Sequence, residues 1–239
     1  MTNLLSFRSV TKTYRGLTAL SELSFDIDAA SITSIVGPNG AGKSTIFNVI
    51  SGYKEPTSGD VIFDGQTITG LAPYKICQIG IARAFQISKP FPGLSVQENV
   101  LVAASFGRTG PRDPERVTGE SLALCRLTEE RHNLASSLTV GGLRRLELAR
   151  AFAARPRLLL ADEPCAGLNE TETTMVTNVL ADARGRGLTI LLVEHDIRAV
   201  RKISDRVIVI EAGRKIADGT EGEVFAQQSV IDAYLGAAL

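Results

Sequence analysis

Short apolar runs along the chain predict buried β-strands. The runs at residues 31–36 (SITSIV), 158–162 (LLLAD), 188–194 (LTILLVE) and 206–213 (RVIVIEAG) are rich in Val, Ile and Leu and too short for typical helices. A segment of helical length, 170–184, separates the second run from the third. Strands that alternate with helices form parallel sheets covered by helices, so this pattern predicts an α/β fold.

Two regions interrupt this alternation. Residues 59–70 (GDVIFDGQTITG) predict a β-hairpin, because Asp64 and Gly65 are favoured in a two-residue turn. The stretch 70–155 is mostly helical in pattern, but its part 106–120 (FGRTGPRDPERVTGE) is rich in Gly, Pro and charged residues and predicts a loop. We therefore expect a smaller helical subdomain inserted into an α/β core.

Composition narrows the class of function. The chain has 239 residues, 44% of them hydrophobic, which is enough for one large domain with a buried core. Lys plus Arg and Asp plus Glu number 26 each, so the net charge is zero, which argues against a nucleic-acid partner. Cys77, Cys125 and Cys165 are scattered and predict reduced thiols rather than a disulfide framework or a zinc site.

The sequence predicts no membrane-spanning helix, since no run of about 18 apolar residues occurs in it. Arg8, Lys12 and Arg15 interrupt the N-terminal region, so we expect no signal peptide there. A role at a membrane would therefore depend on a partner.

Residues 37–44 match the pattern G-x-x-x-x-G-K-[ST] of a phosphate-binding loop, between a predicted strand and a predicted helix. The glycines let backbone N–H groups point at a phosphate chain, Lys43 reaches the β- and γ-phosphates, and the Ser44 hydroxyl binds Mg²⁺. This pattern predicts ATP and Mg²⁺ as cofactors. The predicted cofactor-binding residues are Gly37, Pro38, Asn39, Gly40, Ala41, Gly42, Lys43, Ser44 and Thr45.

Two acidic residues follow a predicted strand at 158–162 and suit the same chemistry. Asp162 ends the strand and is placed to contact Mg²⁺ through water, and Glu163 is placed to activate a water at the γ-phosphate. Alone, the pair could be solvated acids at a strand end. Beside a complete phosphate loop, the catalytic interpretation is favoured.

Several segments in a fixed order resemble the nucleotide-binding subunit of ATP-binding cassette (ABC) transporters over nearly the whole chain. They are GPNGAGKST (37–45), ARAFQ (82–86), SSLTVGGLRRLELARAF (136–152), LLLADEPCAGLN (158–169) and LLVEHD (191–196). The ATPases of branched-chain amino acid importers are similar in particular at GIARAFQISKPFPGLSVQENVLVA (80–103), RRLELARA (144–151), DEPCAGLN (162–169) and VIDAYLG (230–236).

The resemblance implies a fold and a domain plan. It implies one ABC ATPase domain over 1–239, an α/β P-loop NTPase with a mostly parallel sheet and an N-terminal antiparallel β subdomain. The RecA-like catalytic core would comprise about 1–86 and 156–239. The inserted helical subdomain would comprise about 87–155.

The resemblance also implies roles for single residues. Tyr14 would stack on adenine, with packing on the core as the alternative. Gln86 would contact Mg²⁺ or the attacking water, and His195, after a predicted strand, would contact the γ-phosphate. Asn169 takes a position that many cassettes fill with Asp, and the importer subgroup commonly has Asn there. His132, in a polar stretch, is predicted to be a surface residue.

Residues 138–142 (LTVGG) occupy the place of the family's signature loop, LSGGQ, which binds the ATP held by a second subunit. Thr139 keeps the hydroxyl, Gly141 keeps the glycine that approaches phosphate, and Gly142 stands where Gln or Glu is usual. A glycine in the first turn of a helix costs up to about 1 kcal/mol, less than the roughly 1.4 kcal/mol of a tenfold effect. We expect a weakened or retuned loop that still works.

The implied function is ATP hydrolysis coupled to amino-acid import. ATP would close a homo- or heterodimer of ATPase subunits and so move membrane permease subunits docked near residues 86–99. PFPGLSV (90–96) would be this contact surface or, alternatively, subdomain core. A solute-binding protein would act indirectly, and the chain would lie in the cytoplasm, peripheral on the inner face of the cell membrane.

Three other functions stay open. The cassette could serve another small solute such as urea or an amide. It could act on ribosomes or DNA, although its neutral charge and single cassette disfavour a nucleic-acid partner. It could also be a nucleotide-dependent regulatory dimer without useful turnover, and Gly142 is the only sequence feature that favours this alternative.

Overall fold

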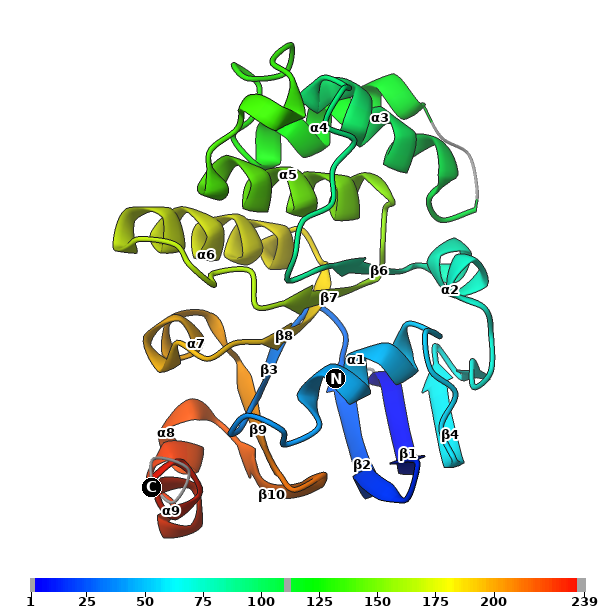
Figure 1. The fold of residues 1–239 in the computed structure, drawn as a ribbon, viewed down its shortest axis with the longest axis vertical. Helices are drawn as coiled ribbons and strands as arrows, with labels where there is room; N and C mark the ends of the chain where they lie inside the picture. The colour runs from blue at the N-terminus through cyan, green and yellow to red at the C-terminus, as the bar shows by residue number, and fades with distance from the viewer. Residues whose placement is uncertain (1–2, 110–112, 236–239) are drawn as a thin grey trace.

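The computed structural model describes residues 3–109 and 113–235, and a six-stranded sheet runs through its centre (Figure 1). All neighbouring strands in this sheet are parallel except the edge pair β9 and β10. The predicted α/β fold with a mostly parallel sheet is confirmed. In spatial order the strands are β10 (Arg214–Gly219), β9 (Arg206–Glu211), β3 (Ile32–Val36), β8 (Thr189–Val193), β7 (Leu158–Asp162) and β6 (Ile81–Ala84).

A second sheet is entirely antiparallel and confirms the predicted N-terminal β subdomain. Its strands, in spatial order, are β2 (Leu17–Asp28), β1 (Asn3–Tyr14), β4 (Ser58–Phe63) and β5 (Gln66–Thr67). The predicted hairpin joins β4 to β5. Asp64 and Gly65 both have positive φ, 51° and 77°, as the favoured two-residue hairpin turn requires. A shared core of apolar side chains, including Phe7, packs this sheet against α1 (Lys43–Ile50).

The helices α3 (Val96–Phe106), α4 (Pro114–Leu124) and α5 (Val140–Ala153) pack on one another above α6 (Glu170–Gly185) in Figure 1. One face of α5 packs into the core, since Leu146, Ala149 and Ala153 are buried and Leu143 is half-buried. This layer occupies the predicted place of the helical subdomain, whose exact limits stay a prediction.

The prediction of a loop over residues 106–120 is wrong for the second half of this range, which forms the start of α4. The Asp113 side chain accepts a hydrogen bond from the Arg116 N–H at 3.2 Å, so it caps the helix, and Pro114 takes the first helical position. Val117 and Leu122 are buried in the helical layer. Charge and proline therefore mark a helix start here, while residues 110–112 of the predicted loop lie outside the described residues.

The remaining helices are short. They are α2 (Pro73–Ile79), α7 (Ile197–Ile203), α8 (Glu221–Phe225), α9 (Gln228–Leu235) and the 3₁₀ turn η1 (Ala135–Ser137). The motif predicted at 230–236 lies on α9, apart from Gly236, which is outside the described residues. The three cysteines are free thiols, as predicted. Within residues 3–109 and 113–235, no helix has the length and apolar character needed to cross a bilayer.

Candidate functional site

The predicted phosphate loop and the predicted catalytic residues lie at the carboxyl ends of four parallel strands. β3 leads into the phosphate loop at residues 37–44, β6 precedes Gln86, β7 precedes Glu163, and His195 follows shortly after β8. Because parallel strands end at the same edge of a sheet, these residues meet although they are far apart in the sequence.

The phosphate loop is held closely against its neighbours. Gly37 has φ 153°, and a Cβ there would lie 2.0 Å from the Ile210 carbonyl oxygen. Gly42 has φ 108°, and its Cβ would lie 2.6 Å from the Ala19 carbonyl oxygen. Both conditions require glycine. The loop therefore keeps its curled backbone, with the first turn of α1 directly behind it.

Lys43 lies inside this curl. Its Nζ donates hydrogen bonds to the carbonyl oxygens of Gly37 at 2.7 Å and Pro38 at 2.9 Å. Burial lowers the pKa of Lys43, while the charge of Glu163 opposes the shift. A buried ammonium at a helix N-terminus is the arrangement expected at a phosphate site. Around it, Ala41 is buried, Thr45 is half-buried, and Asn39, Gly40 and Ser44 are exposed.

The predicted metal-binding residues line one cavity of about 730 Å³, which includes Ser44, Gln86 and Asp162. A hydroxyl, an amide and a carboxylate present oxygen atoms, the donors that Mg²⁺ prefers. Among the described residues no group of three or more His, Cys, Asp or Glu forms a metal cluster. Mg²⁺ beside phosphates needs only one or two protein carboxylates, so this donor set fits it.

The three predicted catalytic residues form one hydrogen-bonded chain. Gln86 Nε2 donates to Glu163 Oε2, and His195 Nε2 lies 2.8 Å from Glu163 Oε1. Glu163 has φ 48°, a left-handed conformation that is uncommon for residues other than glycine. Such strain is often stored at functional sites, where the surrounding structure enforces it. The carboxylate is therefore fixed from two sides.

Two further residues support these three hydrogen-bonded side chains, and the sequence had indicated neither of them. Arg144 donates to the carbonyl oxygens of Gln86 and, at 3.2 Å, of Ala166. Glu194 accepts from the backbone N–H of Cys165 at 2.7 Å and of His195 at 3.1 Å. Burial raises the pKa of Glu194. A carboxylate directly between an apolar strand and a histidine was a signal for Glu194, whereas no local pattern marks Arg144.

The signature loop is built around the N-terminus of α5. Thr139 caps this helix by accepting a hydrogen bond from the Gly142 N–H at 3.1 Å. A Cβ at Gly141 would lie 2.4 Å from Glu172 Oε1, and Glu172 forms a capping box with Asn169 at the start of α6. Within the described part of the chain, no hydrogen bond joins this loop to the phosphate loop, and the loop does not line the cavity above.

Tyr14 and His132 lie apart from this chain of contacts. Tyr14 is half-buried at the end of β1, paired with Leu17 of β2, and the Lys12 ammonium lies 5.1 Å from its ring centroid. Its role in stacking stays a prediction. His132 is exposed, as predicted, and accepts a hydrogen bond from Arg131 Nε.

The structure gives a physical reason for the effect expected at Gly142. In a capping box, a Gln or Glu three residues after the capping Thr returns a hydrogen bond to its backbone. Gly142 holds that position after Thr139 and has no side chain to do so. We expect Gly142→Gln to raise the free energy of unfolding by about 0.5 kcal/mol in urea titrations, because it adds helix propensity and the missing cap. The gain is held to this size because Leu138, 3.2 Å from the new Cβ, has to shift. We also expect turnover to rise by less than about tenfold.

The matched control for this substitution is Gly142→Ala, which adds the Cβ and helix propensity without the cap. If Gly142→Gln is no more stable than Gly142→Ala, the missing cap does not explain the atypical loop.

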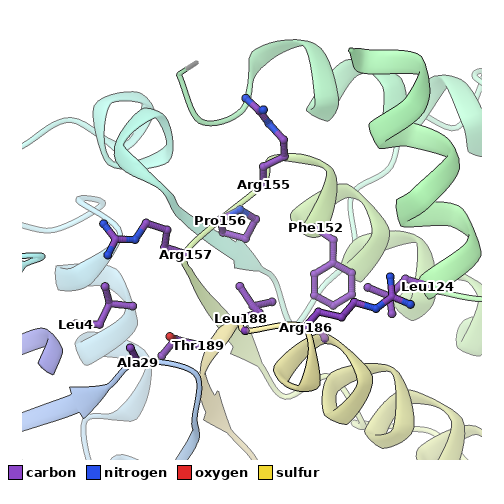
Figure 2. A pocket seen from close by; sticks show the side chains of 12 residues that line it. Leu4, Ala29, Leu124, Phe152, Arg155, Pro156, Arg157, Arg186, Leu188 and Thr189 are labelled. Carbon is purple, nitrogen blue, oxygen red and sulfur yellow. The ribbon is translucent and has the colours of Figure 1, made fainter. Parts of the chain in front are cut away.

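A smaller cavity of about 370 Å³ opens at the opposite edge of the sheet, near the first residues of β7 and β8. Figure 2 shows Arg155, Arg157 and Arg186 around it, pointing away from one another. Arg157 is paired with Asp64, and Arg155 donates to the Arg108 carbonyl oxygen. None of the predicted site residues lines this cavity. The candidate nucleotide site is therefore the phosphate loop together with the adjoining part of the larger cavity, where Ser44, Gln86 and Asp162 lie.

Comparisons with known proteins identify the family of the chain. A family model described as ABC transporter matches residues 20–166. The high-affinity branched-chain amino acid transport ATP-binding protein BraF of Pseudomonas aeruginosa is 36% identical over 251 aligned residues, which cover 98% of each chain. The resemblance seen in the sequence is thus confirmed.

Solved structures of cassettes also resemble the chain. The ADP conformation of MJ1267, an ATP-binding cassette of an ABC transporter, has a TM-score of 0.89 and 27% identity, covering 99% of this chain and 100% of that one. The dimeric post-hydrolysis state of the cassette MJ0796, bound to ADP and Pi, has a TM-score of 0.82 and 27% identity, covering 91% and 99%.

Proposed function

The chain belongs to the ABC transporter family of ATPases, and we propose that it drives an importer for branched-chain or other amino acids. The observation that carries the ATPase assignment is the fixed carboxylate of Glu163, bound by Gln86 and His195 beside the phosphate loop. The amino-acid assignment is supported by the similarity to BraF.

Each side chain of the site has a task in the proposed reaction. Lys43 and the backbone N–H groups of the phosphate loop bind the β- and γ-phosphates. Glu163 takes a proton from the attacking water, and His195 and Gln86 hold its carboxylate in place. Ser44, Asp162 and Gln86 would hold Mg²⁺, which neutralises phosphate charge when it is bound.

The proposed site is complete only in a pair of subunits. Within the described residues, Thr139, Gly141 and Gly142 make no hydrogen bond to the phosphate loop of their own chain, and we propose that they bind another subunit's nucleotide. The dimeric arrangement of the cassette MJ0796 supports such a pair. ATP would then be buried between two chains, and hydrolysis would reopen them.

The proposed permease contact lies at the mouth of the larger cavity, on the cytoplasmic face of the membrane. Phe85 and Ile87 line this cavity and are 38% and 70% exposed, and Phe91, 46% exposed, packs against Arg150 of the same cavity. Apolar side chains exposed together often mark an interaction surface. Residues 90–96 divide between the two predicted roles, because Phe91 is exposed whereas Val96 is fully buried. A solute-binding protein would act through the permease.

The test is uptake by the chain reconstituted with its permease and solute-binding protein in vesicles. We expect ATP-dependent uptake of leucine or valine and faster ATP hydrolysis when the loaded binding protein is present. Uptake of urea or amides instead would replace the proposed solute. Nucleotide-dependent dimer formation without any uptake would favour a regulatory dimer.

A further inference from the structure

We propose that Arg83 is a positioning residue that holds Asp162 ready for the metal and links it to the aromatic side chains at the cavity mouth. This inference rests on the proposed function, because it concerns the metal bound with the nucleotide. The resemblance to known ATPases gave Arg83 no role, and the sequence separates it from Asp162 by 79 residues.

Arg83 joins three elements of the core. It lies on β6, opposite Leu160 of the neighbouring strand β7, whose last residue is Asp162. Its Nη2 lies 2.6 Å from Asp162 Oδ2, and its Nη1 donates to Asn48 Oδ1 of α1 at 2.8 Å. The side chains of Arg83 and Asp162 are only 10% and 8% exposed. Water therefore screens this ion pair weakly.

The geometry leaves one carboxylate oxygen of Asp162 for the metal. Among the described residues, the Arg83 hydrogen bond reaches Oδ2, and Oδ1 accepts none. Asp162 and Ser44 line the same cavity, so Oδ1 is the atom available to Mg²⁺ or to a water that Mg²⁺ binds. Hydrogen-bond partners behind a metal ligand fix its orientation and raise metal affinity.

Arginine suits this place better than lysine does. Its planar fork binds Asp162 and Asn48 at once, whereas a single ammonium is a point charge with no fixed fork. Removing the guanidinium altogether would leave a buried carboxylate without its counter-charge, which is strongly unfavourable. The carboxylate would then turn or draw in water.

The same guanidinium lies against the rings that border the proposed permease contact. Its carbon is 4.8 Å from the Phe85 ring centroid, and the Phe85 ring meets Tyr53 edge-on at 5.9 Å. Phe85 and Tyr53 are 38% and 53% exposed and line the cavity together with Arg83 and Asp162. A partner that displaces Phe85 would therefore change the position of Asp162 through a single side chain, that of Arg83.

The test compares Arg83→Met and Arg83→Lys in the Glu163→Gln background, where binding is measured without turnover. ATP affinity is measured first in EDTA, and the Mn²⁺ concentration that half-saturates the ATP-loaded chain is then measured by electron paramagnetic resonance. For Arg83→Met we expect metal-free ATP affinity to be unchanged and the half-saturating Mn²⁺ concentration to rise about 10- to 100-fold. For Arg83→Lys we expect a smaller rise.

Arg157→Met is the matched control. Arg157 also binds an aspartate, Asp64, and also lies over a phenylalanine ring, Phe63. None of these three residues lines the larger cavity. We expect it to leave the Mn²⁺ dependence unchanged. The inference is overturned if Arg83→Met, folded by circular dichroism, keeps the parent's Mn²⁺ dependence. If Arg83→Met does not fold, an unchanged dependence in Arg83→Lys overturns it equally.

The link to the cavity mouth is tested with Phe85→Leu. If Phe85 acts through Arg83, this change weakens Mn²⁺ binding in the parent and adds nothing once Arg83 is Met. Equal effects in both backgrounds, or no effect in either, contradict the link.

Failure of the proposed function has a different signature from failure of this inference. A parent chain that binds no ATP, with or without metal, contradicts the ATPase assignment. A parent that binds ATP and metal normally, alongside an Arg83→Met variant that does the same, contradicts only the role of Arg83.

Discussion

Glu163→Gln is expected to lower ATP turnover by about 100-fold or more and to hold the chain as an ATP-bound dimer. A glutamine has nearly the same shape as glutamate but cannot take the proton of the attacking water, and general-base catalysis contributes about 10²- to 10⁴-fold. Its amide still reaches Gln86 and His195, which hold the carboxylate in the native chain. Binding should therefore persist while the chemical step fails.

The measurements are phosphate release and the elution volume of the chain on size-exclusion chromatography with MgATP. We expect the native chain to run mainly as a monomer, because it hydrolyses the ATP that closes the dimer, and the variant to run as a dimer that EDTA dissociates. Glu170→Gln is the control, since Glu170 lies in the first turn of α6, exposed to solvent. Near-native turnover in the Glu163 variant would remove the general base from the proposed mechanism.

The features that the sequence predicted well are those that depend on neighbouring residues in the chain. The phosphate loop needs a strand, glycines at fixed spacing and a lysine, and these occur within residues 31–45. The turn at Asp64 and Gly65 and the buried strand at 158–162 are equally local. Local spacing therefore predicted the confirmed fold class and most of the candidate nucleotide site.

The start of α4 shows how a local signal can be misread. Gly, Pro and charged residues are common in loops, and this composition dominates residues 106–120. The pair Asp113 and Pro114 is also a frequent helix start, because the aspartate caps the free N–H groups and proline has none to satisfy. The positions of Asp113 and Pro114 indicate the start of α4, whereas the average composition of residues 106–120 does not.

Other parts of the site depend on contacts that local spacing does not contain. Arg83 meets Asp162, and Arg144 meets Gln86, only because the folded strands and helices place them together. Contacts between two chains are harder still to predict, and within the described residues no hydrogen bond joins the signature loop to the phosphate loop of its own chain. The sequence pattern predicts the chemistry of the phosphate loop. The residues that support the site from other elements can be identified only in the folded structure.

Lys43→Met is expected to weaken the binding of both ATP and ADP by about 10- to 100-fold. The Lys43 ammonium is buried at the centre of the phosphate loop, and a hydrogen bond to a charged group contributes roughly 1.5–3 kcal/mol. Methionine keeps the length of the side chain but neither bonds phosphate nor holds the carbonyl oxygens of Gly37 and Pro38. Loss of charge and loss of loop shape thus act in the same direction.

The comparison of ADP with ATP separates this variant from Glu163→Gln. Lys43 is proposed to contact the β-phosphate, which both nucleotides carry, so titration calorimetry should show weaker binding of each. Glu163 acts on the water that attacks the γ-phosphate, so its variant should bind ADP as the native chain does. Lys202→Met, at an exposed lysine on α7, controls for the loss of a positive charge. Unchanged ADP affinity in Lys43→Met would contradict the placement of the phosphates in the loop of residues 37–44, because the Lys43 ammonium lies inside that loop.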